Sequence, residues 1–279
     1  MPPELPILTL HLFPKLDELL LDFLRNLSPA DWEKQTIVPL WTIKDIAAHL
    51  LDGNLRTLSM SRDGYFGEKP NPIESYGDLV AYLNRLNADW VKAFKRVSPT
   101  VLIELLELTG SQYNTYLKTL NPYTPAIFSV AWAGEENSQN WFHIAREYTE
   151  KWHHQQQMRL AMGQEEVLYA TELYFPYLDT SMQALPHHYR NVMAEPGTVI
   201  LFEVKGIPNA QWYLQRGENA WVLSKTLDQT PIASVGIEGS IAWRMLTKGI
   251  AKAEAAKRVE IEGDQKLGAV VLDMLAVMA

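Results

Sequence analysis

The 279-residue sequence contains no cysteine. The protein therefore has no disulfide, no thiolate zinc site and no thiol nucleophile of its own, so any sulfur chemistry needs a small molecule that supplies the sulfur. No apolar run reaches the roughly 18 to 20 residues that a membrane span needs, and no tract is of low complexity. Residues 1–20 lack the cationic start and apolar core of a signal peptide. We expect a cytoplasmic protein, folded throughout, without membrane contact.

Positive charge is also in short supply. Lysine and arginine together number 25 against 33 aspartates and glutamates, which gives a formal net charge of -8. A field of this sign repels polyphosphate, and no basic stripe offsets it. The composition therefore argues against a nucleic-acid partner and favours a small-molecule substrate, and it leaves the oligomeric state open.

The first half of the chain has the apolar spacing of amphipathic helices. Thr42 and Asp45 stand at the two positions of a capping box, and Gly163 follows the longest apolar-periodic segment as a helix-ending glycine would. The predicted helices cover residues 12–27, 42–60, 75–97, 98–109 and about 137–162.

The second half changes to the two-residue period of β-strands after one more predicted helix over residues 171–183. Strands are expected over residues 198–206, 210–217, 219–226, 231–239 and 258–263, and helices over 240–249 and 265–278. The fold class is therefore α+β with two domains. Residues 1–166 are expected to form an antiparallel bundle of four main helices, and residues 167–279 a small α+β domain.

One face of the longest predicted helix carries a polar stripe. At about 100° per residue around the helix axis, four other polar side chains lie within about 60° of Glu150. The rest of the helix is largely apolar, and an unpaired buried charge costs several kcal/mol, so the stripe needs partners inside the protein. Its members are His143, Glu147, Glu150, His154 and Gln157.

Glu150 and His154 are four residues apart, so a carboxylate and an imidazole converge on successive turns and can share a metal ion. His153 points about 100° away from His154 and is expected to pack or to donate a hydrogen bond nearby. The candidate for a third ligand is His49, which lies in the middle of another predicted helix. From the residues alone, a hydrogen-bonded core histidine and a solvated Glu-His pair explain these spacings equally well.

Three segments resemble a known group of proteins. LSPADWEKQTIVPLWTIKDIAAHLLDG (residues 27–53) and EKWHHQQQMRLAMG (150–163) resemble the DinB-like superfamily. Together with residues 238–278 they are most similar to the mycothiol-dependent maleylpyruvate isomerase group. The resemblance implies a DinB-like four-helix bundle that binds a metal, followed by a sterol-carrier-like α+β domain.

The same resemblance implies His49, Glu150 and His154 as the metal ligands. Zinc is the expected ion, with nickel or another borderline divalent metal as the alternative, because two imidazoles and a carboxylate suit several such ions. The implied cosubstrate is a low-molecular-weight thiol of the mycothiol or bacillithiol type.

Two positions depart from the group's pattern. Gln157 stands where members usually have aspartate, and a neutral amide can orient a ligand but cannot act as a base. Ile250 stands where many have arginine, so a carboxylate clamp is not expected there. Arg244 and Lys248, a little upstream, are candidate substitutes, although an ordinary surface role is the favoured explanation of both. Trp41 is the other side chain expected beside the site, with Gln157 and His153 close to the ligands.

These observations predict a metal-dependent, thiol-using isomerase or thiol S-transferase that acts on a small electrophile. The alternative is a non-enzymatic module, stabilised by a metal, that binds an apolar ligand or a partner protein. In that case His143 or Glu147 would supply a fourth protein ligand and close the coordination sphere.

Overall fold

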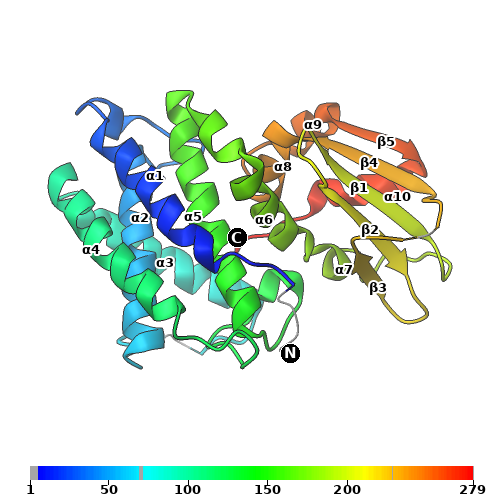
Figure 1. Ribbon diagram of the computed structural model, residues 1–279, viewed down its shortest axis with the longest axis horizontal. Coiled ribbons are helices and arrows are strands. Elements are labelled where there is room, and N and C mark those ends of the chain that lie inside the picture. Colours follow the sequence, from blue (N-terminus) through cyan, green and yellow to red (C-terminus); the bar gives the residue numbers. More distant parts are fainter. Residues whose placement is uncertain (1–5, 69–71, 228, 279) are drawn as a thin grey trace.

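The computed structural model describes residues 6–68, 72–227 and 229–278, with a helical part and a sheet part side by side (Figure 1). Helices α1, α2, α4 and α5 contact one another around a ring, and α3 packs against α2. This arrangement confirms the predicted four-helix bundle. The long helices are α1 (Phe13–Arg25), α2 (Ile43–Arg56), α3 (Tyr76–Phe94), α4 (Pro99–Leu117) and α5 (Asn140–Met162).

Helix α2 begins at the predicted capping box. The Asp45 backbone N–H donates to Thr42 Oγ1 (3.3 Å), and the Thr42 backbone N–H donates to Asp45 Oδ2 (3.0 Å). At the end of α5, Gly163 takes a left-handed conformation with φ of 65°, which favours glycine. Both helix boundaries read from the sequence are therefore confirmed.

Helix α4 is longer than the sequence suggested. The prediction ended at Thr109, but the helix continues through Gly110 to Leu117. A Cβ atom at position 110 would lie 3.0 Å from Asp17 Oδ2 on α1. Gly110 therefore serves the close approach of two helices rather than the end of one.

The remaining helical elements are short, apart from α6. Thr57–Arg62 (η3) extends α2 as a π-helical segment. The others are η1 (Leu10–Leu12), η2 (Asp31–Glu33), η4 (Ala131–Ala133), η5 (Glu165–Tyr169), α6 (Thr171–Met182), α7 (Leu185–His188), α8 (Gly239–Leu246), α9 (Lys252–Ala255), η6 (Ala256–Arg258), α10 (Gln265–Ala269) and η7 (Val270–Asp273).

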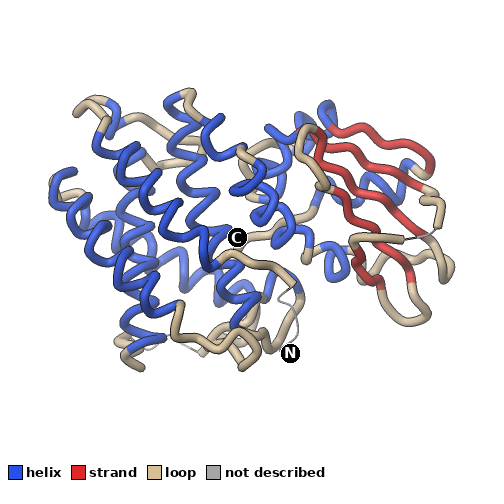
Figure 2. Tube along the Cα trace, in the orientation of Figure 1, coloured by secondary structure: helices blue, strands red, loops and turns tan. Residues whose placement is uncertain are grey.

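The strands gather in the C-terminal part (Figure 2). They form a five-stranded mixed sheet with the order β3-β2-β1-β4-β5. Strands β1 and β4 are parallel and the other neighbouring pairs are antiparallel. Every predicted strand is present. The strands are β1 (Val199–Lys205), β2 (Gln211–Arg216), β3 (Trp221–Ser224), β4 (Ala233–Glu238) and β5 (Val259–Gly263).

The prediction of one continuous last helix over residues 265–278 is wrong. Helical structure ends at Asp273, and Met274 takes an extended conformation. The Ala276 backbone N–H then donates to the Leu246 carbonyl at the end of α8 (3.0 Å). Pairing with another element thus replaces the helical hydrogen bonds that the apolar sequence would also have allowed.

Aromatic side chains join the bundle to the sheet part. Trp152 on α5 stacks on Tyr174 and Tyr177 of α6 (centroids 4.8 and 4.3 Å apart), and Trp243 of α8 meets it edge-on at 6.3 Å. The Tyr174 hydroxyl donates to the Gly239 carbonyl (2.6 Å). One hydrophobic core therefore continues from α5 through α6 to the sheet, and a domain boundary near residue 166 stays a prediction. Among the described residues, no helix has the length and hydropathy to cross a membrane.

Candidate metal centre

Side chains from α2 and α5 converge on one point in the bundle. His49, Glu150 and His154 each offer a ligand atom, and these atoms all lie within 4.8 Å of one another. The ring centroids of His49 and His154 are 4.6 Å apart, and His154 Nε2 lies 3.5 Å from Glu150 Oε2. The structure therefore brings together the three residues selected from helical spacing and family resemblance.

The charge states at this point suit metal ligation. The pKa of His49 lies well below its usual 6.5, mainly because the residue is buried and secondly because of the charge of His154. The His49 imidazole is therefore neutral. Burial by itself would raise the pKa of Glu150. The hydrogen bond with His154 and the surrounding histidines outweigh burial and lower the pKa of Glu150 below its usual range. A carboxylate thus faces the neutral imidazole of His49, and both are in the protonation state in which they bind a divalent cation.

Gln157 orients His154. Its Oε1 lies 2.8 Å from His154 Nδ1 and accepts the hydrogen bond, which leaves Nε2 directed toward Glu150. His153 has a different partner, since its Nδ1 donates to the Thr149 carbonyl (2.7 Å). The two adjacent histidines therefore hydrogen-bond to different partners, as their 100° separation on the helix predicts.

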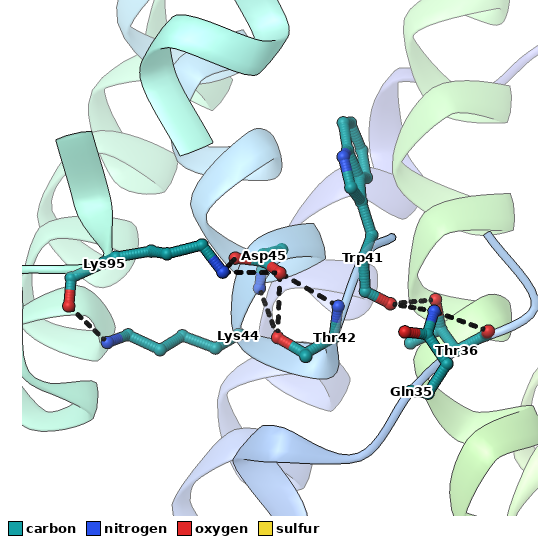
Figure 3. Close-up of polar contacts among 7 residues, drawn as sticks. All are labelled: Gln35, Thr36, Trp41, Thr42, Lys44, Asp45 and Lys95. Carbon is teal, nitrogen blue, oxygen red and sulfur yellow. Dashed lines mark hydrogen bonds and ion pairs between the residues drawn. The ribbon is translucent and has the colours of Figure 1, made fainter. Parts of the chain in front are cut away.

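Trp41 lies over the imidazoles from the segment before α2. Its ring centroid is 5.0 Å from that of His49 and 6.4 Å from that of His154. The Trp41 carbonyl accepts hydrogen bonds from the Thr36 backbone (3.1 Å), Thr36 Oγ1 (2.8 Å) and Gln35 Nε2 (2.9 Å) (Figure 3). Trp41 is thus fixed beside the candidate ligands, where it was expected.

The start of α2 is tied to the end of α3. Lys95 Nζ lies 3.4 Å from the capping carboxylate of Asp45, and Lys44 Nζ donates to the Lys95 carbonyl (3.2 Å) (Figure 3). Just before Trp41, the exposed Leu40 has a left-handed φ of 68°. Strain of this kind persists only where the surroundings hold the backbone firmly, so the segment that carries Trp41 is well constrained.

The two candidates for a fourth protein ligand are engaged elsewhere. Glu147 accepts from Arg146 Nη2 (2.7 Å) and from the Tyr113 hydroxyl (2.8 Å). Arg146 Nη2 also donates to His143 Nδ1 (2.7 Å). Within the described ranges, the only group of possible ligands found around the site is His49, Glu150 and His154. No local sequence pattern pointed to Tyr113, because its contact with Glu147 crosses from α4 to α5.

The contacts of Arg244 lie at the junction with the sheet part. Its Nη2 is 3.5 Å from Glu165 Oε1, and its guanidinium lies 5.6 Å from the ring centroid of Trp243. No interaction between Arg244 and the three candidate ligands is found in the described part of the chain. A role for Arg244 beside the metal centre stays a prediction.

Fold and site together define a helical bundle with a candidate three-ligand metal centre, joined to an α+β part. The family model described as the mycothiol maleylpyruvate isomerase N-terminal domain matches residues 13–159. The chain belongs to this family. The match covers just over half of the 279 residues and includes all three candidate ligands.

Solved structures of a mycothiol-dependent maleylpyruvate isomerase share the fold of the whole chain. One aligns over 91% of this chain and 91% of its own, with 10% sequence identity and a TM-score of 0.54. A histidine-to-alanine mutant structure of that name aligns over the same shares with 10% identity and a TM-score of 0.53. No curated protein matches the chain. At this level of identity the likeness establishes the fold alone.

Proposed function

We propose that the protein is a metal-dependent enzyme that uses a low-molecular-weight thiol to isomerise, or to add the thiol to, a small electrophile. The observation that carries the proposal is the convergence of three ligand atoms within 4.8 Å, while His143 and Glu147 pair with Arg146. Three protein ligands are typical of catalytic rather than structural sites.

The residues present fit a divalent ion. His49 Nδ1 is buried and has no hydrogen-bond partner, and such an unsatisfied nitrogen is costly unless something binds it. Two imidazoles and a carboxylate suit zinc, and nickel or another borderline ion is the alternative. When bound, such an ion supplies an open coordination position and lowers the pKa of a thiol placed there.

The protein's own side chains would orient and shield the reactants. Gln157 holds the His154 ring through Nδ1, and the Trp41 ring lies beside both imidazoles, with centroids 5.0 Å from His49 and 6.4 Å from His154. The Glu150 side chain is 32% exposed, so the site is reachable from solvent. Because the chain has no cysteine, the sulfur nucleophile comes from the cosubstrate.

The proposed isomerisation conserves the thiol. Its sulfur adds to an electron-poor cis double bond, the resulting single bond rotates, and expulsion of the thiol restores the double bond in the trans form. In an S-transferase the new carbon–sulfur bond would persist instead. Gln157 cannot take up a proton, so no step relies on it as a base.

Metal analysis and turnover test the proposal together. Purified protein should contain a divalent metal, and it should convert maleylpyruvate, or a reactive aryl chloride, only when both the metal and mycothiol or bacillithiol are present. Glu150→Ala should abolish turnover while its circular dichroism spectrum stays that of the folded protein. Metal-replete protein that neither binds nor consumes any of these thiols would instead favour the non-enzymatic binding module.

A further inference from the structure

A second site lies where α1 and α5 run side by side (Figure 1). A pocket of about 220 Å³ opens between the C-terminal half of α1 and the end of α5. Five of the nine residues that line it are apolar, and none is a candidate metal ligand. The apolar lining comes from Leu19, Phe23, Leu27, Met162 and Val167.

Arg159 brings a positive charge to this pocket. Its side chain lines the cavity, although the residue is only 4% exposed. Nη2 donates to the Leu19 carbonyl (2.9 Å), and the guanidinium lies 5.0 Å from the ring centroid of Phe23. Nε is buried and has no hydrogen-bond partner. The wall of the pocket therefore includes an arginine whose guanidinium is incompletely hydrogen-bonded within the protein.

This arginine has no counter-charge among the described residues. Asp22 also lines the pocket, but no ion pair within 4.0 Å joins it to Arg159. Burial lowers the pKa of Arg159 to about 10, so the guanidinium is still charged at neutral pH. A charge removed from water is costly unless a partner compensates it. An anionic ligand would supply the missing partner.

We infer that this pocket binds a small carboxylic acid with an apolar tail, and that the carboxylate pairs with Arg159. The planar guanidinium presents donors in a fork that matches a carboxylate, and the tail would contact Phe23, Leu27 and Met162. A single cation with Asp22 nearby suits a monoanion better than the dianionic form of phosphate.

The pocket is separate from the metal centre. Arg159 follows His154 by five residues, which places it about 140° around α5. Neither His49, Glu150 nor His154 lines the cavity. The inference therefore does not rest on the proposed enzymatic function, and the two can fail independently.

Calorimetric titration with octanoate tests this assignment. Wild-type protein should bind octanoate saturably, and a chelator should leave the titration unchanged because the carboxylate does not bind at the metal centre. Arg159→Met should weaken binding at least tenfold. The matched control Arg258→Met changes an exposed arginine that pairs with Glu238, and it should bind like the wild type.

Two further measurements keep the test decisive even if Arg159→Met does not fold. Val167 is 44% exposed at the pocket, so Val167→Trp should fill the cavity, keep the fold and weaken octanoate binding at least tenfold. Inorganic phosphate should bind at least tenfold more weakly than octanoate. The inference is wrong if the wild type does not bind octanoate saturably, or if Val167→Trp binds octanoate as tightly as the wild type. Arg159 would then serve only to pack on Phe23 and to donate to the Leu19 carbonyl.

Discussion

Helix α5 carries two polar clusters that differ in how the charge of their glutamate is compensated. In the first, Arg146 bridges His143 and Glu147, and Tyr113 donates to the same carboxylate. In the second, one to two turns later, His49 Nδ1 has no hydrogen-bond partner, and the Glu150 side chain is 32% exposed. The first cluster compensates its own charges. The second has, among the described residues, no arginine or lysine paired with Glu150, so its carboxylate can pair with a bound ion.

The comparison teaches that residue type alone does not distinguish a structural cluster from a functional one. Each cluster contains a glutamate and a histidine on the same face of the helix, and arginine makes the difference. A neighbouring cation neutralises Glu147 within the fold, whereas the neighbours of Glu150 are imidazoles. We therefore expect metal and activity to depend on one cluster and stability on the other.

The largest expected effect is loss of metal from His154→Ala. Removing one of three ligands should reduce the metal content from about one ion per chain to a small fraction of that value, as measured by elemental analysis after dialysis. His153→Ala is the matched control and should keep the metal, since its Nδ1 donates to the Thr149 carbonyl. Equal losses from both variants would contradict the assignment of the pair.

Arg146→Met should give the largest loss of stability. The side chains of Arg146 and Glu147 are 14% and 16% exposed, so removing the cation leaves a poorly solvated carboxylate, at a cost of about 3 to 5 kcal/mol in the free energy of unfolding. Urea denaturation would measure this change, and the metal content of folded protein should not fall.

Arg85→Met provides the control for that prediction. Arg85 pairs with Glu68 on the surface, where the two side chains are 48% and 58% exposed. An exposed pair of this kind contributes about 0 to 1 kcal/mol. If the Arg146 and Arg85 variants unfold at the same urea concentration, the first cluster is not the structural element that we describe.

Acid should destabilise the protein partly through His143. Burial, and then the charge of Arg146, lower the pKa of this imidazole from 6.5 to about 4. Between these values the unfolded chain binds the proton that the folded protein excludes. Stability should therefore fall as the pH drops from about 6.5 to about 4, by at most about 1.4 kcal/mol per pH unit from this group.

Urea unfolding at several pH values would test this contribution. His143→Gln removes the titrating group and keeps a side chain that can accept from Arg146, so the variant should lose stability less steeply over the same pH range. If the free energy of unfolding falls as steeply with pH in His143→Gln as in the wild type, other groups cause the acid sensitivity.

The smallest expected effect is that of Gln157→Leu on metal affinity. Loss of the hydrogen bond to His154 Nδ1 should weaken metal binding by about 10- to 100-fold, as measured by competition with a chromogenic chelator. Gln156→Leu is the control, because Gln156 Nε2 donates to the Glu165 carbonyl and not to a ligand. Its metal affinity should match that of the wild type, although its stability should be lower.

Local signals in the sequence predicted most of the secondary structure. The Thr42–Asp45 capping box, Gly163 and the alternation in β1 and β4 each act over a few neighbouring residues, so they can be recognised without the fold. The errors occurred where a distant contact decided the outcome. Gly110 is needed for the approach to Asp17, and residues 274–278 leave the helix where Ala276 bonds to Leu246.

The sequence by itself determined the polar stripe on α5, because helical geometry fixes which side chains share a face. Its place in the middle of another predicted helix made His49 the candidate partner across the bundle, and the family resemblance supported that choice. Only the tertiary structure decided which members of the stripe stay free, since Tyr113 reaches Glu147 from α4. It also decided that Arg159 is buried beside Phe23 without a counter-charge. These contacts depend on how the helices pack. Phe23 and Arg159 are far apart in the sequence, so no local pattern predicts that they meet.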